Sequence, residues 1–259
     1  MVLLLWLMGS TALLAQPTIG IQGQLGFPAN EYADNISTVG GGLNLNFAVP
    51  VVEDFPLAIG AGFGWMNIGN HEEKIREQLT ISSPESGITF NVPLNYRIVT
   101  NSNFLHVHAL ARLRPPVDWP VVPYVEALGG FRYLYTRTQV IEETQERESY
   151  PDTEVEEDVE TVVAADTHIN DWVLSYGYGG GFQFRLGAAA SLDLNVQWLR
   201  GTNARYYDRE DVSEWELSFT PNRQTQNSEE DGTLTVQASP RESTTDIFMA
   251  SLGVTFSLD

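Results

Sequence analysis

The chain has 259 residues, with 34 acidic against 14 basic side chains, a formal net charge of -20 and no cysteine. This acidity excludes a protein that binds nucleic acid by neutralising phosphates. The lack of cysteine excludes a disulfide framework and thiolate chemistry. After residue 15 no segment approaches 18 consecutive apolar residues, so the sequence also excludes a membrane-spanning helix.

The first element is an apolar run over residues 2–14 that ends at the small residue Ala15. The run is too short for a helix that spans a bilayer, but it has the length of the apolar part of a secretory signal. We predict that residues 1–15 are a cleaved signal peptide and that residues 16–259 form one domain. The alternative is a buried strand or helix of the mature fold.

Beyond the signal, apolar and polar residues alternate with the period of two that is typical of β-strands. In the stretch 121–136, Phe131 and Tyr133 lie on one face, whereas Glu126 and Arg132 lie on the other. The same pattern predicts eight strands, over 18–27, 41–49, 57–67, 88–114, 121–136, 170–186, 191–206 and 245–258.

The stretch 88–114 contains two alternating runs, and the apolar face changes parity across residues 100–103. It forms either one long strand with a bulge or two strands joined by a hairpin. Two strands would give a total of nine, an odd number that bacterial single-chain barrels avoid. We therefore predict one long strand with a bulge, with residues 78–81 prolonging the strand before it.

Short and long connections alternate along the chain, which places all the short ones at one end of the fold. The acidic segments 142–166 and 208–231 are expected to be exposed loops at the other end, the second with a hairpin of its own near Gly232. A soluble sandwich has no reason to separate its loops in this way. A barrel of the bacterial outer membrane does, with short turns on one side and long loops on the other.

The polar faces of several predicted strands are small, as in Gly60, Gly62 and Gly64, and the apolar faces carry aromatic rings. Small residues suit the crowded interior of a narrow barrel, and aromatic girdles flank the lipid-facing belt of a membrane barrel. We predict an all-β fold, an eight-stranded antiparallel up-and-down transmembrane β-barrel. The predicted girdle at the loop end comprises Trp65, Tyr96, Tyr133, Tyr135, Trp172, Tyr176 and Trp198, and that at the turn end Phe47, Phe104, Trp119 and Phe256.

Three segments carry a resemblance to a known family: PYVEALGGFRYLYT at 123–136, LSYGYGGGFQFRL at 174–186 and LGVTFSL at 252–258. Through them the chain resembles small outer-membrane β-barrel proteins of the OmpA-like class, the outer membrane protein beta-barrel domain family. The resemblance implies the outer membrane of a Gram-negative bacterium, contact with outer-membrane lipid, and insertion by the barrel-assembly machinery, which recognises the last strand. Asp259 after Leu258 departs from the usual terminal phenylalanine.

An eight-stranded barrel has an interior just wide enough for side chains, and buried charges there must be paired. We predict that Glu126 and Asp193 pair with arginines among Arg112, Arg132 and Arg185 in one charge network that plugs the lumen. Simple filling of the interior is favoured over a gated ion path. The charged residues expected to point inward are Arg97, Arg112, Arg114, Glu126, Arg132, Arg185 and Asp193.

His106 and His108 lie two residues apart on one strand face, a spacing that could bind a metal if carboxylates faced them. With four histidines and no cysteine in the chain, hydrogen-bonded histidines in the lumen are favoured, and we expect no metal and no cofactor. The function predicted is structural or in surface interaction, with an unknown surface ligand. The alternatives are a narrow or gated porin-like channel and, less favoured, a lipid-modifying membrane enzyme.

Overall fold

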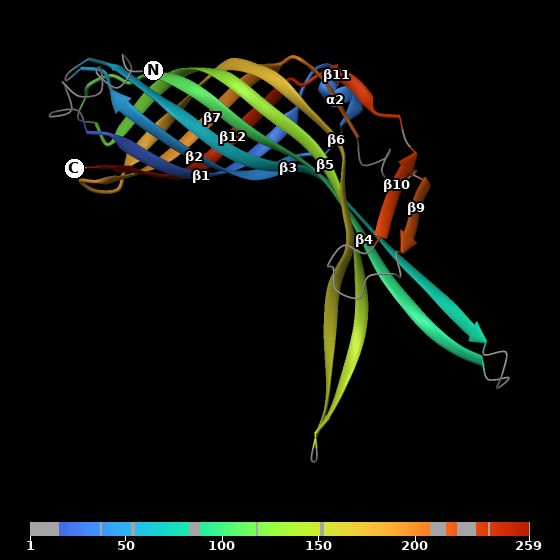
Figure 1. Cartoon of the computed structure of the whole chain (residues 1–259). Helices are drawn as coiled ribbons and strands as arrows, with labels where there is room; N and C mark the ends of the chain where they lie inside the picture. Colours follow the sequence, from blue (N-terminus) through green and yellow to red (C-terminus); the bar gives the residue numbers. More distant parts are fainter. Residues whose placement is uncertain are drawn as a thin grey trace, which may run out of the picture.

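The computed structural model is a closed barrel of eight antiparallel strands (Figure 1), which confirms the predicted fold class. It describes residues 16–36, 38–52, 55–82, 89–117, 119–150, 153–207, 216–221, 232–237 and 239–258. Around the ring the order is β1-β12-β7-β6-β5-β4-β3-β2. These strands are β1 (Thr18–Pro28), β2 (Gly40–Pro50), β3 (Leu57–Ser82), β4 (Thr89–Leu113), β5 (Val121–Tyr150), β6 (Thr153–Arg185), β7 (Ala190–Gly201) and β12 (Ile247–Ser257).

The ring closes between its first and last strands, where β1 pairs with β12 from Thr18 opposite Ser257 to Pro28 opposite Ile247. Closure leaves no sheet edge within the barrel, so every strand there is paired on both sides. A short helix, α2 (Glu31–Asn35), connects β1 to β2. No helix among the described residues is long and apolar enough to cross a membrane. The connection from β7 to β12 contains β8 (Asn203–Tyr206), β9 (Glu216–Pro221), β10 (Gly232–Gln237) and β11 (Arg241–Thr244).

Apolar side chains point out of the barrel and polar side chains point in. Leu43 and Tyr178 are 61% and 68% exposed on the outside, whereas Gln22 and Asp193 are buried inside. This distribution is the reverse of that in a water-soluble protein, and it is stable only where hydrocarbon covers the outer belt. The lipid-facing belt includes Ile21, Leu25, Leu43, Leu45, Ile59, Phe63, Val107, Val125, Phe131, Leu174, Phe182, Leu194, Val196 and Leu252.

The two ends of the barrel differ. One end, called the turn end here, holds the short connections after β2, β4 and β6 together with Thr18 and Ser257. The other, the loop end, holds α2 and β11 (Figure 1), together with β8, which pairs with β11. The separation of short from long connections agrees with the sequence prediction.

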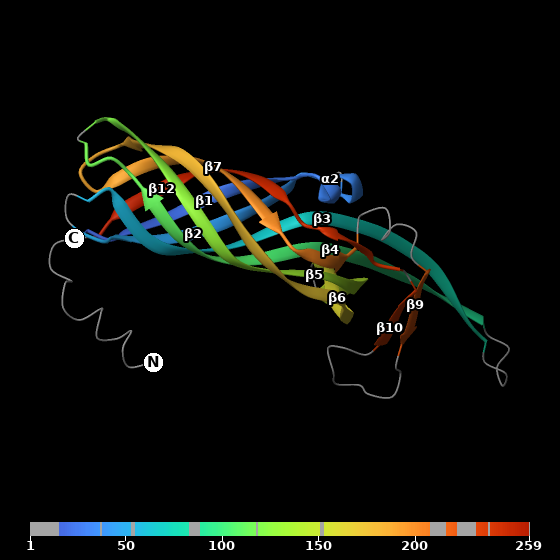
Figure 2. The same cartoon turned by 90° about the horizontal axis from the view of Figure 1, so that it is seen from above.

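Two hairpins continue far beyond the loop end (Figures 1 and 2). β3 and β4 stay paired as far as Ser82 opposite Thr89, and β5 and β6 as far as Tyr150 opposite Thr153. We call these hairpins the arms. The prediction that 142–166 is a loop is therefore wrong. β-Branched residues recur among the acidic ones there, as in VETVVAAD at 159–166, and they favour an extended ladder.

The stretch 88–114 is a single strand, β4, as predicted, but the bulge is not in it. The register shifts on β3 between Asn67 and Gly69, which leaves Ile68 as the extra residue. β4 itself pairs with β5 without a shift from Tyr96 to Leu113. The change of parity that we attributed to a bulge has another cause.

Alternation along β4 is unbroken, and only the chemistry of its faces changes. His106 and His108 are buried below Phe104, and Thr100 and Ile98 are buried on the same face above it. Polar residues therefore fill the inner face within the lipid-facing belt. Beyond the belt this face is mixed, with Ser102 and Thr100 between the apolar residues Phe104 and Ile98. Ile98 packs there with Val140 and Ala164, as in a water-soluble sheet. The change of parity marks the end of the lipid-facing belt.

The long connection before β12 differs in part from the prediction. The predicted strand 191–206 is two strands, β7 and β8, and β8 pairs with β11. The predicted hairpin is present, with β9 paired to β10 from Pro221 opposite Gly232 to Glu216 opposite Gln237. Residues 208–215 and 222–231, and the predicted signal peptide 1–15, lie outside the described residues.

Candidate functional site

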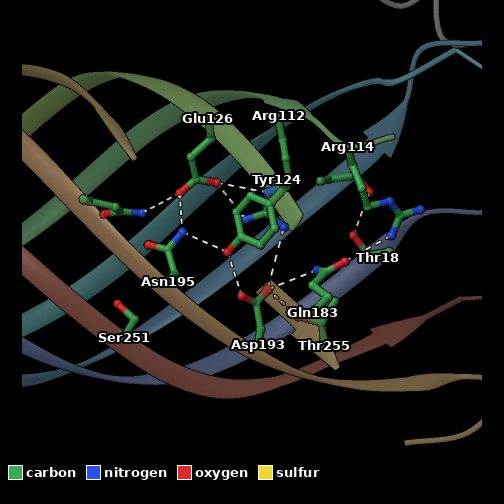
Figure 3. A network of polar contacts seen from close by, with 12 residues as sticks. Thr18, Arg112, Arg114, Tyr124, Glu126, Gln183, Asp193, Asn195, Ser251 and Thr255 are labelled. Carbon is green, nitrogen blue, oxygen red and sulfur yellow. Dashed lines mark hydrogen bonds and ion pairs between the residues drawn. The ribbon is translucent and has the colours of Figure 1, made fainter. Parts of the chain in front are cut away.

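The candidate site is the polar interior of the barrel, and its turn-side layer is ionic. The register places Arg112 of β4 directly opposite Glu126 of β5. The Arg112 Nε and Nη2 atoms donate to Glu126 Oε2 at 3.0 and 2.8 Å, and Nη1 lies 3.9 Å from Asp193 Oδ2 on β7 (Figure 3). All three side chains are buried. The structure thus brings together three of the five residues predicted to form a charge network.

Neutral side chains complete this layer (Figure 3). The Tyr124 hydroxyl donates to Asp193 Oδ1 at 2.6 Å, and the Arg112 guanidinium lies 4.2 Å from the centre of the Tyr124 ring. Asn195 Nδ2 donates at 2.8 Å to both Tyr124 Oη and Glu126 Oε1. The other donors to the two carboxylates are Gln197 at 2.8 Å, Gln183 at 3.1 Å and Thr255 at 3.2 Å.

Every carboxylate oxygen in this layer accepts at least one hydrogen bond. Satisfaction of this kind is what allows charges to stay buried, because an unpaired charge in a low-dielectric interior is costly. Sequence reasoning missed Tyr124, Asn195 and Gln197, since neutral residues carry no charge signal. Their shared inward parity with Glu126 and Asp193 was the available signal.

Arg132 and Arg185 lie elsewhere, so the prediction of one network that includes them is wrong. Arg132 is on β5, six residues beyond Glu126, which at about 3.3 Å per residue places it roughly 20 Å away. Its Nη2 donates to the Thr245 carbonyl at 2.6 Å. Arg185, the last residue of β6, is exposed at the turn end and donates to the Val117 carbonyl at 3.2 Å.

Two further arginines predicted to point inward also differ in position. Arg114 lies at the turn end, where Nη1 donates to Gln183 Oε1 at 3.1 Å. Arg97 is not in the lumen but on the arm of β4, where it pairs with Glu143 and Glu160. The prediction for Arg97 is wrong because β4 continues beyond the barrel.

The middle layer of the lumen contains the histidine pair. The Nδ1 atoms of His106 and His108 are 3.3 Å apart, and His106 Nε2 lies 3.1 Å from Gln24 Oε1. Gln24 Nε2 in turn donates to Ser251 Oγ at 3.3 Å. Within the described part of the chain, no three His, Asp or Glu side chains are grouped closely enough to hold a metal ion.

The loop-side layer is mostly apolar, and a buried arginine in it, Arg132, has its guanidinium 5.8 Å from the centre of the Phe104 ring. Met66, Phe104, Leu199 and Met249 are almost completely buried, and Tyr32 of α2 meets Tyr206 edge to face at 5.1 Å. The placement of Phe104 in the turn-end girdle is therefore wrong, because its side chain points inward at the opposite end. The full cluster comprises Tyr32, Ile36, Met66, Ile68, Phe104, Leu134, Val173, Leu199, Ala204, Tyr206, Ile247 and Met249.

Asp246 holds the connections at the loop end together. Its carboxylate accepts hydrogen bonds from Asn30 Nδ2 at 2.7 Å and from the Gly201 amide at 3.1 Å, and it lies 3.8 Å from Arg200 Nε. Asn30 precedes α2 and has a φ of 53°, a conformation that few residues other than glycine adopt. The bond to Asp246 thus fixes the start of α2 and, with it, Tyr32 over the lumen.

The outer rings form a row at the loop end. Trp65, Leu105, Tyr133 and Trp172 are directly paired across β3, β4, β5 and β6. The Tyr133 ring lies 4.9 Å from Trp172 and 5.7 Å from Tyr135. Trp198 is paired with Tyr178 and Phe248.

Tyr96 does not belong to this row of rings. It is on the arm, half-buried against the cluster of Ile98, Val140 and Ala164. The prediction of Tyr96 in the girdle is wrong for the same reason as that of Arg97, since β4 continues past the lipid-facing belt.

Hollows lie at the turn end and in the middle of the lumen, among the described residues. A pocket of about 450 Å³ at the turn end is lined by Arg112, Arg114 and Gln183 together with apolar residues that include Phe55 and Leu57. Further in, beside the histidine pair, is a cavity of about 10 Å³. The space inside the barrel thus narrows from the turn end toward the apolar layer.

No family model matches the chain, and no curated protein matches it. Among solved structures, the chain is similar to Neisserial surface protein A (8% identity, 93% of this chain and 96% of that chain, TM-score 0.37). It is similar also to Ail, the attachment invasion locus protein of Yersinia pestis (12% identity, 94% of this chain and 97% of that chain, TM-score 0.35). A third similar structure is a major outer membrane protein from Thermus thermophilus (13% identity, 93% of this chain and 99% of that chain, TM-score 0.37). These similarities are too low to indicate a function, and the fold assignment rests on the strand pairing itself.

Proposed function

We propose that the chain is an integral outer-membrane β-barrel protein, exported with its signal peptide removed, with a structural or surface-interaction role. The observation that carries this proposal is the closed ring of eight strands with an apolar outer belt and a buried polar interior. Barrels of this kind belong to the bacterial outer membrane, where a short-turn end and a long-loop end face opposite sides. The turn end then faces the periplasm and the arms face the exterior.

In this proposal the lumen is closed by side chains. Two buried layers support this closure, the ionic layer of Arg112, Glu126 and Asp193 and the apolar layer around Phe104, with a cavity of about 10 Å³ between them. A hydrated ion needs a far wider path. The barrel is therefore a scaffold for the arms, and they are the surface that it presents.

The arms are suited to surface interaction because they carry polar and charged groups beyond the lipid-facing belt. On them, Arg97 joins Glu143 on β5 to Glu160 on β6. β9 and β10 add a third hairpin beside β6, which β10 contacts. We propose a role in surface contact for this region and name no ligand for it.

A narrow or gated channel is the second candidate, favoured by the continuous series of polar side chains from the turn-end pocket to the histidine pair. A lipid-modifying enzyme is less favoured. His108 is 1% exposed inside the lumen, where the barrel wall separates it from the acyl chains of lipids.

Two measurements test the proposal. The folded protein in detergent should run as a compact band without boiling and shift on heating, as a closed barrel does. In planar bilayers it should then give no discrete conductance steps. A folded, heat-modifiable protein that conducts would establish the channel, whereas a monomer that stays folded in detergent-free buffer would exclude the membrane barrel altogether.

A further inference from the structure

Several buried polar atoms in the middle layer have no hydrogen-bond partner among the described residues. They are Nε2 of His108, Nε2 of Gln22 and both amide atoms of Asn46. These three side chains line the same cavity of about 10 Å³. A buried polar group without a hydrogen-bond partner is destabilising, so this group of side chains beside one cavity requires an explanation.

The cavity exists because one residue between these side chains is a glycine. Gly62 of β3 is paired with Asn46 on one side and with His108 on the other. A Cβ atom at Gly62 would lie 3.6 Å from Asn44 Oδ1 and 3.9 Å from the Leu45 carbonyl, which is ordinary contact. The missing side chain thus leaves space between two polar residues that do not reach each other.

The hydrogen bonds of the histidine pair determine which nitrogen carries each proton. Gln24 Nε2 donates to Ser251, so Gln24 Oε1 accepts from His106 Nε2. A neutral imidazole has one N–H, so His106 Nδ1 is an acceptor and His108 Nδ1 is its donor. In two neutral rings, His108 Nε2 therefore carries a lone pair toward the cavity.

The other side chains around the cavity offer complementary groups. Gln22 Oε1 accepts from Asn44 Nδ2 at 3.0 Å, which leaves the Gln22 Nε2 donor for the cavity. Asn46 also lines the cavity, but both of its amide atoms lie over Gly20, 2.8 Å from the position that a Cβ there would take. Glu126, the one carboxylate among the lining residues, already accepts two hydrogen bonds on each oxygen. The set suits a ligand that both donates and accepts rather than a cation.

We propose that one water molecule is bound in this cavity, donating to His108 Nε2 and accepting from Gln22 Nε2. A cavity of about 10 Å³ is near the minimum that one water requires, and two to four polar partners are typical of a buried water. The water begins a relay that continues through His108, His106 and Gln24 to Ser251. Arg112 lines both this cavity and the turn-end pocket, whereas the apolar layer closes the other side, so the water enters from the turn end.

Nuclear magnetic resonance of the folded protein in detergent micelles, with ¹⁵N-labelled histidine, tests the proposal. We expect a proton on Nε2 of His106 and on Nδ1 of His108, and a persistent cross-peak between water and the His108 ring. Protons on Nε2 of both rings, or no such cross-peak, would overturn it. Adding Zn²⁺ should leave the His108 Nε2 signal in place, and a shift would establish a metal site instead.

A matched pair of variants sharpens the test. Gly62→Ala places a methyl group in the cavity and should remove the water cross-peak and shift the His108 Nε2 signal. Gly129→Ala adds the same group at an exposed position, where a Cβ would meet nothing within 4 Å, and should change neither. A cross-peak that survives Gly62→Ala in a folded barrel would contradict the proposal. If Gly62→Ala does not fold, the protonation pattern of His106 and His108 in the wild-type protein still tests the proposal.

The inference rests on the closed lumen of the proposed function, and the two can fail separately. Conductance with the predicted protonation pattern would refute the closed lumen alone. A non-conducting barrel without the water cross-peak would refute the hydration site alone.

Discussion

The two halves of the lumen are filled by opposite kinds of side chain. On the turn side, Arg112, Glu126 and Asp193 are buried and connected by hydrogen bonds. On the loop side, Met66 and Phe104 lie in an apolar cluster that resembles the core of a soluble protein. The two halves meet between Phe104 and His106, which are neighbours on the same face of β4.

The difference follows from what surrounds each half. Within the lipid-facing belt the outer face takes the apolar residues, so the inner face holds polar groups that must satisfy one another. At the loop end α2, β8 and β11 cover the opening, and water replaces lipid outside, so burying apolar side chains inside becomes favourable. The turn-side half therefore depends on every partner being present, whereas the loop-side half depends on volume.

The largest effect is expected from Glu126→Ala. It leaves the Arg112 guanidinium buried without its carboxylate and removes the acceptor of Asn195 and Gln197. Breaking a buried pair from one side costs about 3–5 kcal/mol. Urea unfolding in detergent micelles, followed by tryptophan fluorescence, measures the loss. Glu126→Gln keeps a hydrogen-bond acceptor and should lose less stability. A loss below about 1 kcal/mol for Glu126→Ala would show that the turn-side network does not stabilise this half of the barrel.

On the loop side, Phe104→Ala should lower the free energy of unfolding by about 3 kcal/mol, because it removes apolar volume and leaves a cavity. The matched control is Phe131→Ala, since Phe131 is 55% exposed on the lipid-facing side and detergent can fill the space. The same unfolding assay compares them. Equal losses for the two variants would mean that the loop-side layer is not packed as a core.

The barrel could be predicted from the sequence because alternation survives in every strand of the ring. Face parity also placed Arg112, Glu126 and Asp193 correctly on the inside. Parity does not give the level along the strand, however. Arg132 points inward but donates to the Thr245 carbonyl, and Arg185, at the end of β6, donates to the Val117 carbonyl. The level of a residue depends on register, which a single sequence does not specify.

The errors on β4 and on the acidic arm have one origin. A prediction that extends the membrane pattern to the end of each strand attributes the exchange of apolar faces on β4 to a bulge and misplaces Tyr96, Arg97 and Phe104. In 142–166 the acidic composition was given more weight than the β-branched residues among the acids. The strands β4, β5 and β6 continue beyond the lipid-facing belt without ending, and beyond that level the rules of soluble sheets apply.

A smaller effect is expected at the cover of the loop-side half. Asn30→Ala removes the hydrogen bond to Asp246. It also places alanine at a positive φ, which alanine tolerates less well than asparagine does. Together these changes should lower the free energy of unfolding by about 1–2 kcal/mol. Asn30→Gly removes only the bond and should cost less. The environment of Tyr32, followed by near-ultraviolet circular dichroism, reports the change. If glycine is the worse of the two variants, backbone strain at this position is not part of the cost.

The smallest effect is expected on the arms, beyond both halves of the lumen. Arg97→Ala removes the pairs with Glu143 and Glu160. Exposed pairs add little to global stability and are screened by salt, so the unfolding midpoint of the barrel should not change. Amide hydrogen exchange of β4 and β5 above Phe104 should become faster, and less so at high salt. An equal increase in exchange below His106 would mean that arm and barrel open as one unit. The boundary between Phe104 and His106 would then mark a change in the kind of side chain inside the barrel, but not a change in local stability.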